Sequence, residues 1–251
     1  MKRHACATVM CLILAATGVT AEGPNGDAAS IIGLPDAPGD VVATIPAPGA
    51  GTYGLAWDGT HLWASDNTTY TIYELDPATG AVISSFAAPP GTYPNDLTWD
   101  GTHLWVAVND GDTIYRVDTT GAVVTSFPSP GSGPDGLAWD GQYLWHSDFN
   151  TSTIYQLDPA TGAVLSSFPA TSPNGMAYDG TYLWYVDNSP PVFYRVDPAT
   201  GAVITSFAAP SGNPRGLTFD GTYLWVSEPI SGNIYQIDAG VPVELQTLTV
   251  D

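Results

Sequence analysis

A unit of about 40 residues occurs five times along this chain, and this repeat constrains the fold more than any other feature. Each copy contains an aromatic-Asp-Gly-x-x-Leu-Trp string. The aspartates stand at positions 58, 100, 140, 179 and 220, at intervals of 42, 40, 39 and 41 residues. Parallel solenoid repeats are shorter, and an immunoglobulin-like sandwich would not repeat its own sequence. The repeat therefore predicts a ring or array of similar modules.

The pattern inside each unit predicts four short strands. Apolar and polar residues alternate, β-branched and aromatic residues are frequent, and turn signals come about every ten residues. The Asp-Gly pair predicts a tight two-residue turn between the first and second strands. Between the third and fourth strands, Pro77 is expected to set the first turn angle and Gly80 to take the left-handed one.

Four antiparallel strands in about 40 residues is the period of a β-propeller blade. The sequence therefore predicts an all-β, five-bladed propeller over residues 39–240, with four antiparallel strands per blade. The chain contains 22 prolines and 27 glycines. A helix-rich fold is excluded, because these residues would interrupt nearly every helix.

Two segments compete to complete the last blade. Residues 39–45 match a fourth strand such as residues 80–86, whereas residues 243–248 could serve the same position from the other end. We expect the N-terminal strand to close the ring, because joining the first and last blades removes exposed strand edges. Residues 241–251 would then be a C-terminal tail or an extra edge strand.

The first residues predict an export signal. Residues 2–4 are basic, residues 5–16 are apolar, and residues 19–21 are the small residues that a signal peptidase reads. The apolar run is too short to span a bilayer, so no membrane span is expected. We assign residues 1–21 to a signal peptide and residues 22–38 to an N-terminal linker. The protein is expected to be secreted or periplasmic.

Charge and cysteine content exclude several classes of partner and site. With 25 acidic and 5 basic residues, the formal net charge is −20. Nucleic acid and anionic lipid are poor partners for such a chain, which is expected to be a soluble monomer. Cys6 and Cys11 both lie in the signal peptide, so the mature chain should have no disulfide, thiol nucleophile or zinc–thiolate site.

Most of the conspicuous residues recur once per blade and are therefore expected to be structural. All eight tryptophans occupy repeat positions, which favours packing between blades over an aromatic cage. His61 and His103 follow Asp-Gly turns and are expected on the surface, while His146 stands alone on a second strand. This scattering of histidines gives no metal-binding spacing.

The residues that differ between blades are better candidates for a site. One such position is the first residue of the x-Gly-Leu string, or its close relative, at which the loop before each first strand ends. The innermost strands should bring the residues at this position to one mouth of the central channel. The predicted ligand-binding residues are Tyr53, Asn95, Asp135, Asn174 and Arg215, together with Asp96, which replaces a glycine in the second unit. The loops after the second strands should open on the same face. Their leading residues are Asp66, Val108, Asp148, Asp187 and Glu228. The acidic ones are expected to accept hydrogen bonds from loop amides.

The repeat resembles those of secreted bacterial propellers of the NHL and YVTN kind over residues 40–238. The segments 94–96, 134–136 and 173–175 (Pro-Asn-Asp, Pro-Asp-Gly and Pro-Asn-Gly) are also similar to site-bearing segments of SMP-30/gluconolactonase propellers. That resemblance implies a divalent metal, usually calcium, with Asn95, Asp135 and Asn174 as its ligands. The glutamate of that family is missing here, and the family has six blades.

A five-bladed relation to plant-type glutaminyl cyclotransferases is a further alternative, although their Phe-Thr-Gln-Gly-Leu signature is absent.

The sequence favours a binding role over catalysis. No nucleophile–base pair is recognisable, and the G-x-S-x-G, H-E-x-x-H and EF-hand motifs are absent. We expect the mouth to bind a small polar ligand, a glycan or a protein. The alternatives are a calcium-dependent, lactonase-like hydrolase or lyase, a glutaminyl cyclotransferase-like enzyme, and a purely structural module. Because Arg215 would repel a cation beside Asp135, weak metal binding or none is expected.

Overall fold

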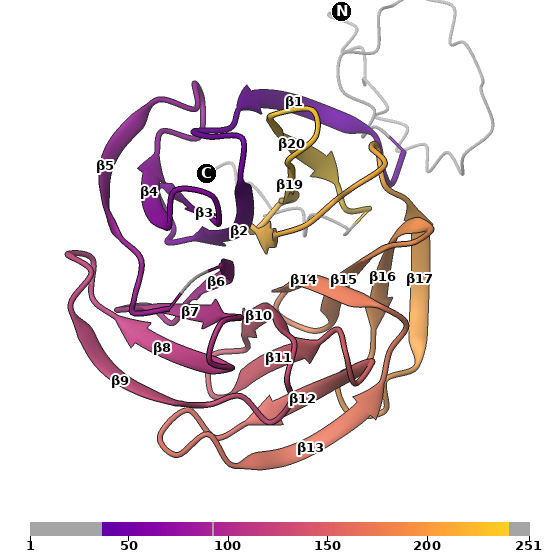
Figure 1. The fold of residues 1–251 in the computed structure, drawn as a ribbon. Helices are drawn as coiled ribbons and strands as arrows, with labels where there is room; N and C mark the ends of the chain where they lie inside the picture. Colours follow the sequence, from indigo (N-terminus) through magenta and orange to yellow (C-terminus); the bar gives the residue numbers. More distant parts are fainter. Residues whose placement is uncertain (1–36, 92, 241–251) are drawn as a thin grey trace, which may run out of the picture. The chain divides into compact units, whose positions relative to one another are not determined.

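Five four-stranded antiparallel sheets surround a common centre in the computed structural model, which describes residues 37–91 and 93–240 (Figure 1). The fold is a five-bladed β-propeller, as the repeat predicted. The first blade consists of β2 (Thr52–Trp57), β3 (Leu62–Asp66), β4 (Thr71–Leu75) and β5 (Val82–Ala87). The second consists of β6 (Pro94–Trp99), β7 (Leu104–Val108), β8 (Thr113–Val117) and β9 (Val123–Pro128).

The third blade consists of β10 (Pro134–Trp139), β11 (Leu144–Asp148), β12 (Thr153–Leu157) and β13 (Val164–Pro169). The fourth consists of β14 (Pro173–Tyr178), β15 (Leu183–Asn188), β16 (Pro191–Val196) and β17 (Val203–Ala208). The fifth consists of β18 (Leu217–Phe219), β19 (Tyr223–Glu228), β20 (Asn233–Asp238) and, on its outside, β1 (Val41–Pro46). The first strand of each repeat is innermost.

The N-terminal strand closes the ring, as predicted. β1 pairs antiparallel with β20 along the outer edge of the fifth blade, where Ile45 lies opposite Ile234 (Figure 1). The buried side chain of Ile45 packs with Leu55 of the first blade and Trp225 of the fifth. One strand therefore completes the last blade and also contacts the first, which gives the ring its closure.

The signal peptide predicted at 1–21, residues 22–36 of the predicted linker and the tail predicted at 241–251 lie outside the described residues. Within the described ranges, no helix is long and apolar enough to cross a membrane.

The repeated tryptophans pack between blades, as predicted. Trp63 of the first blade lies in one buried cluster with Leu97 and Val106 of the second, and Trp105 lies in another with Leu137 of the third. The five second-strand tryptophans are at most 3% exposed. Each blade thus buries its face against the next, which is how stacked repeats obtain a continuous core.

The Asp-Gly hairpin is longer than the two-residue turn expected from sequence. Trp57 pairs with Leu62, so residues 58–61 form a four-residue loop, closed by a bond from the Asp58 N–H to the His61 carbonyl oxygen. Gly59 has a φ of +100°, which accounts for the glycine. The aspartate acts through its side chain instead. Its Oδ1 accepts the N–H groups of Thr60 and His61, and its Oδ2 accepts the Trp63 indole N–H at 2.9 Å.

Candidate functional site

The innermost strands approach one another so closely that four of the five blades carry glycine at the same position. A Cβ on Gly136 would lie 2.1 Å from the Asn174 carbonyl oxygen, and one on Gly216 would lie 2.2 Å from the Tyr53 carbonyl oxygen. No side chain fits at such distances. The innermost strands of neighbouring blades are therefore in direct backbone contact at this position.

Asp96 stands at the corresponding position of the second blade, and its carboxylate reaches the innermost strands of other blades. Its carboxylate accepts the N–H groups of Leu55 at 3.1 Å, Leu137 at 2.9 Å and Met176 at 3.4 Å, which belong to three other blades. Burial raises the pKa of Asp96 well above its ordinary value, although the amide hydrogen bonds act in the opposite direction. Asp96 is 1% exposed, and its hydrogen bonds connect the second blade to the first, third and fourth. Its predicted ligand-binding role remains a prediction.

Arg215 lies among the predicted mouth residues and connects several of them. Its guanidinium carbon is 5.1 Å from the centroid of the Tyr53 ring, and its Nη1 donates to Asn174 Oδ1 at 2.8 Å. The Asn188 amide, oriented with its oxygen toward the guanidinium, accepts from Nη1 at 2.9 Å and from Nη2 at 3.2 Å. Within the described residues, the buried Nε of Arg215 has no hydrogen-bond partner. Tyr53, Asn174 and Asn188 therefore fix the guanidinium of Arg215, although its Nε–H group stays unpaired.

A cavity of about 250 Å³ opens at this face. Two of the predicted ligand-binding residues, Asp135 and Arg215, line it. The other lining residues are Asn109, Gly133, Phe149, Asn150 and Asn188. Asn109, Phe149 and Asn150 come from the loops that follow β7 and β11, and Asn188 ends β15. Sequence reasoning placed these loops on the correct face but named Val108, Asp148 and Asp187, the residues just before the ones that line the cavity.

Asp135 and Arg215 give the cavity two opposite charges. Burial raises the pKa of the Asp135 carboxyl group to about 6, the nearby Arg215 charge lowers it, and the negative charge of Asp148 raises it further. Near neutral pH the cavity therefore contains a carboxyl group close to its titration range beside a permanent cation. Such a group is suited to exchanging a proton with a bound molecule.

The two asparagines of the predicted set do not line the cavity. Asn95 donates its amide to the Pro134 carbonyl oxygen at 3.0 Å, and the buried Asn174 donates to the Ser172 carbonyl oxygen at 2.9 Å. The Oδ1 of Asn174 already accepts from the Arg215 cation, which would repel a second positive ion. In this structure the Asn95 and Asn174 side chains bind protein groups, while Asp135 lines the cavity. Calcium binding by these three residues stays a prediction.

The acidic residues that lead the loops after the second strands accept hydrogen bonds from loop amides, as predicted. Asp66 accepts the N–H groups of Gly51, Thr68 and Thr69, and Asp148 accepts those of Gly133 and Thr151. Asp187 accepts the N–H group of Ser189, and Glu228 accepts that of Ser231. These carboxylates shape the loops around the mouth.

The structure also pairs His146 with Ser129, which sequence reasoning missed. His146 Nε2 lies 3.0 Å from Ser129 Oγ, and Nδ1 lies 3.3 Å from the Gly136 carbonyl oxygen. Burial lowers the pKa of His146 to about 4, so the ring is neutral at pH 7. Neither residue lines the cavity. In the four other blades an alanine occupies the position of Ser129. The repeat therefore contained a signal for this pair, because the one serine at this position comes just before the blade with the one histidine on a second strand.

Solved structures share this fold at low sequence identity. Glutaminyl cyclase from Myxococcus xanthus aligns with a TM-score of 0.69 and 16% identity, over 79% of this chain and 94% of that one. A catalytically inactive variant of virginiamycin B lyase from Staphylococcus aureus, solved with quinupristin, aligns with a TM-score of 0.51 and 21% identity, over 77% and 68%. The structure of a nidogen/laminin complex gives 0.57 and 18%, over 75% and 76%.

No protein-family model matches the chain, and no curated protein matches it in sequence. The structural likenesses show the fold alone: a propeller architecture that is found both in enzymes and in a protein–protein complex.

Proposed function

We propose that this chain is an exported β-propeller that binds a small polar ligand at the channel mouth. Export is supported by the composition of residues 1–21, and the mouth by the cavity of about 250 Å³. A volume of this size lies just below the range typical of small-molecule sites. Glycans and proteins are broader alternatives, and the nidogen/laminin complex is an example of this fold in a protein assembly.

The observation that carries the proposal is Arg215. Inside a chain with a formal net charge of −20, this arginine is held at the cavity by Tyr53, Asn174 and Asn188, with its Nε unpaired. Because Nε is buried, a ligand would meet the part of the guanidinium that lines the cavity. A guanidinium fixed in this way recognises carboxylate or other electron-rich oxygen groups. Phe149, which is 44% exposed, adds an apolar wall. The proposed ligand therefore has one anionic or strongly accepting group beside a small apolar or ring portion.

Calorimetry with matched pairs of small molecules tests the proposal. The pairs are carboxylic acids and their neutral amides, and sugar acids and their parent sugars. We expect the acid member of at least one pair to bind, and Arg215→Met to weaken that binding at least tenfold, about 1.4 kcal/mol. Gln142→Glu on the opposite face lowers the net charge by the same single unit and should leave binding unchanged. Equal binding to Arg215→Met, or no binding in any pair, contradicts the proposal.

A second candidate function is catalysis at the same cavity, and Asp135 is the observation in its favour. A carboxyl group with a pKa of about 6 can act as a general acid or base near neutral pH. The propeller neighbours include a glutaminyl cyclase and a virginiamycin B lyase. Turnover is tested with glutaminyl peptides, quinupristin, esters and lactones, with and without calcium. Turnover that is lost in Asp135→Asn would favour an enzyme, and turnover abolished by chelation would favour the lactonase-like alternative.

A further inference from the structure

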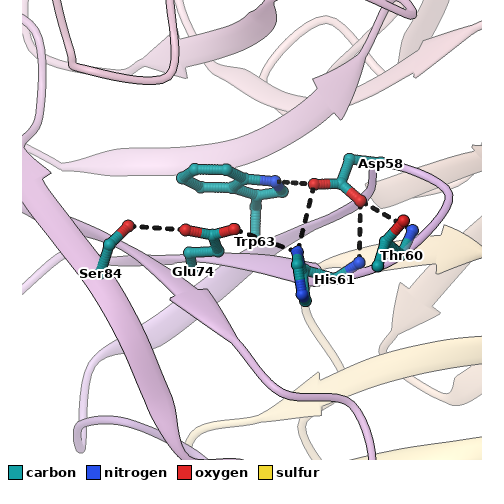
Figure 2. Close-up of polar contacts among 6 residues, drawn as sticks. All are labelled: Asp58, Thr60, His61, Trp63, Glu74 and Ser84. Atoms are coloured by element: carbon teal, nitrogen blue, oxygen red, sulfur yellow. Dashed lines mark hydrogen bonds and ion pairs between the residues drawn. The ribbon is translucent and has the colours of Figure 1, made fainter.

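Three metal-ligating side chains of the first blade lie together at the end of the sheet opposite the mouth. Figure 2 shows the His61 ring between the carboxylates of Asp58 and Glu74. His61 Nδ1 is 3.0 Å from Glu74 Oε1 and 4.0 Å from Asp58 Oδ2. One donor atom from each residue lies within 4.8 Å of the other two. His61 and Glu74 belong neither to the cavity at the mouth nor to the buried clusters around the first blade.

The other blades show that this cluster departs from the repeat. Each has the same aspartate, and in three of them the third-strand residue that corresponds to Glu74 is a donor that binds it. Arg116 donates to Asp100 at 2.7 Å, Arg195 to Asp179 at 2.7 Å, and Gln236 to Asp220 at 3.1 Å. In the first blade Glu74 replaces this donor with a second carboxylate. Two negative groups then face one imidazole, and a divalent cation would balance them.

We propose that Asp58, His61 and Glu74 form a binding site for a divalent transition-metal ion, with zinc as the preferred ion. Zinc lies about 2.0–2.2 Å from imidazole nitrogen and carboxylate oxygen ligands, so two ligands at a tetrahedral angle are about 3.4 Å apart. The separations of 3.0 and 4.0 Å lie on either side of this value, and the three donor atoms all lie within 4.8 Å of one another, so small side-chain rotations would bring them onto one ion. Calcium is disfavoured because it prefers a larger shell of oxygen ligands.

The surrounding groups hold the ligands in place, as the outer shell of a metal site does. Ser84 Oγ donates to Glu74 Oε2 at 2.7 Å, and the Trp63 indole donates to Asp58 Oδ2 at 2.9 Å (Figure 2). Asp58 Oδ1 is fixed by two loop amides. The His61 side chain is 34% exposed, so an ion can enter from solvent. Three protein ligands leave one tetrahedral position for a water molecule or another ligand.

The test is calorimetric titration of the metal-stripped full chain with zinc chloride. Glu74→Arg copies the second blade, and His61→Tyr copies the third, fourth and fifth blades, so both changes suit the hairpin. We expect each variant to bind one zinc ion fewer per chain than the wild type. Any zinc held by His4, Cys6 or Cys11 is common to all the proteins and cancels in this difference. Cobalt absorption bands in the wild type that are missing from Glu74→Arg provide a second readout.

The control is His103→Tyr, the same change in the second blade, where Arg116 replaces the glutamate. It should leave zinc binding unchanged, and so should Arg215→Met, which separates this site from the mouth. Thermal unfolding without metal verifies that each variant is folded. The proposal is overturned if the wild type and Glu74→Arg bind equal amounts of zinc, or if His103→Tyr loses as much as His61→Tyr.

Discussion

At the scale of single residues, the aspartate of each Asp-Gly pair joins the hairpin loop to the tryptophan core. In the fourth blade, Asp179 accepts the N–H groups of Thr181 and Tyr182, the Trp184 indole N–H at 2.8 Å and the Arg195 guanidinium at 2.7 Å. This carboxylate therefore satisfies two backbone donors, one aromatic side chain and one charge.

Asp179→Ala should lower the free energy of unfolding by about 3 kcal/mol, because it leaves the indole and the guanidinium without their acceptor. Urea unfolding followed by tryptophan fluorescence measures the change. Asp220→Ala is the matched variant in the fifth blade. It should cost less, since the neutral Gln236 replaces the arginine there. Equal losses in the two blades would contradict this account of the charged pair.

Asp135 should make stability depend on pH. Its pKa is raised from 3.8 to about 6 by folding, so the folded state binds the proton more tightly than the unfolded state does. Its contribution to stability is therefore greatest in acid and is lost as the pH rises from about 4 to about 6. The free-energy difference between wild type and Asp135→Asn should fall across this window by roughly 1–3 kcal/mol. A difference that is constant, or that rises with pH, would refute the assignment.

At the scale of elements, turns and the alternation of strand side chains depend on residues that are adjacent in the sequence. The sequence therefore predicted the strands of each blade. Gly80 takes a φ of +73° at the turn where a left-handed residue was expected. The hairpin length was missed, because an Asp-Gly pair alone does not fix where pairing resumes. The hydrogen bond between Asp58 and Trp63 could have been predicted, because the same five-residue spacing recurs in all five copies.

β1 gives an element-scale prediction. Ile45 is 3% exposed and packs in the cluster between the first and fifth blades, whereas Val42 of the same strand is 39% exposed. Ile45→Ala should lower the free energy of unfolding by about 2–4 kcal/mol. Val42→Ala should change it by less than about 0.5 kcal/mol. Chemical denaturation compares the two. If both variants unfolded like the wild type, ring closure by β1 would not be important for stability.

At the scale of the whole molecule, the sequence predicted only in part which side chains from different blades come together at the mouth. The repeat predicted that Asp135 and Arg215 face one mouth, and both line the cavity. It did not predict that Asn95 and Asn174 turn to neighbouring groups, because these contacts depend on how far each blade is rotated against the next. The burial of Asp96 could not be predicted for the same reason, because its hydrogen-bond partners are backbone amides of three other blades.

The most direct test of the central claim is NMR mapping of amide shifts with the carboxylate and sugar-acid probes. The account predicts dose-dependent shifts that gather on Asn109, Asp135, Asn188 and Arg215 and disappear in Arg215→Met. Shifts that gather instead on the hairpin loops at the opposite end of the blades, such as residues 58–61, or that persist in Arg215→Met, would contradict a ligand site at the channel mouth.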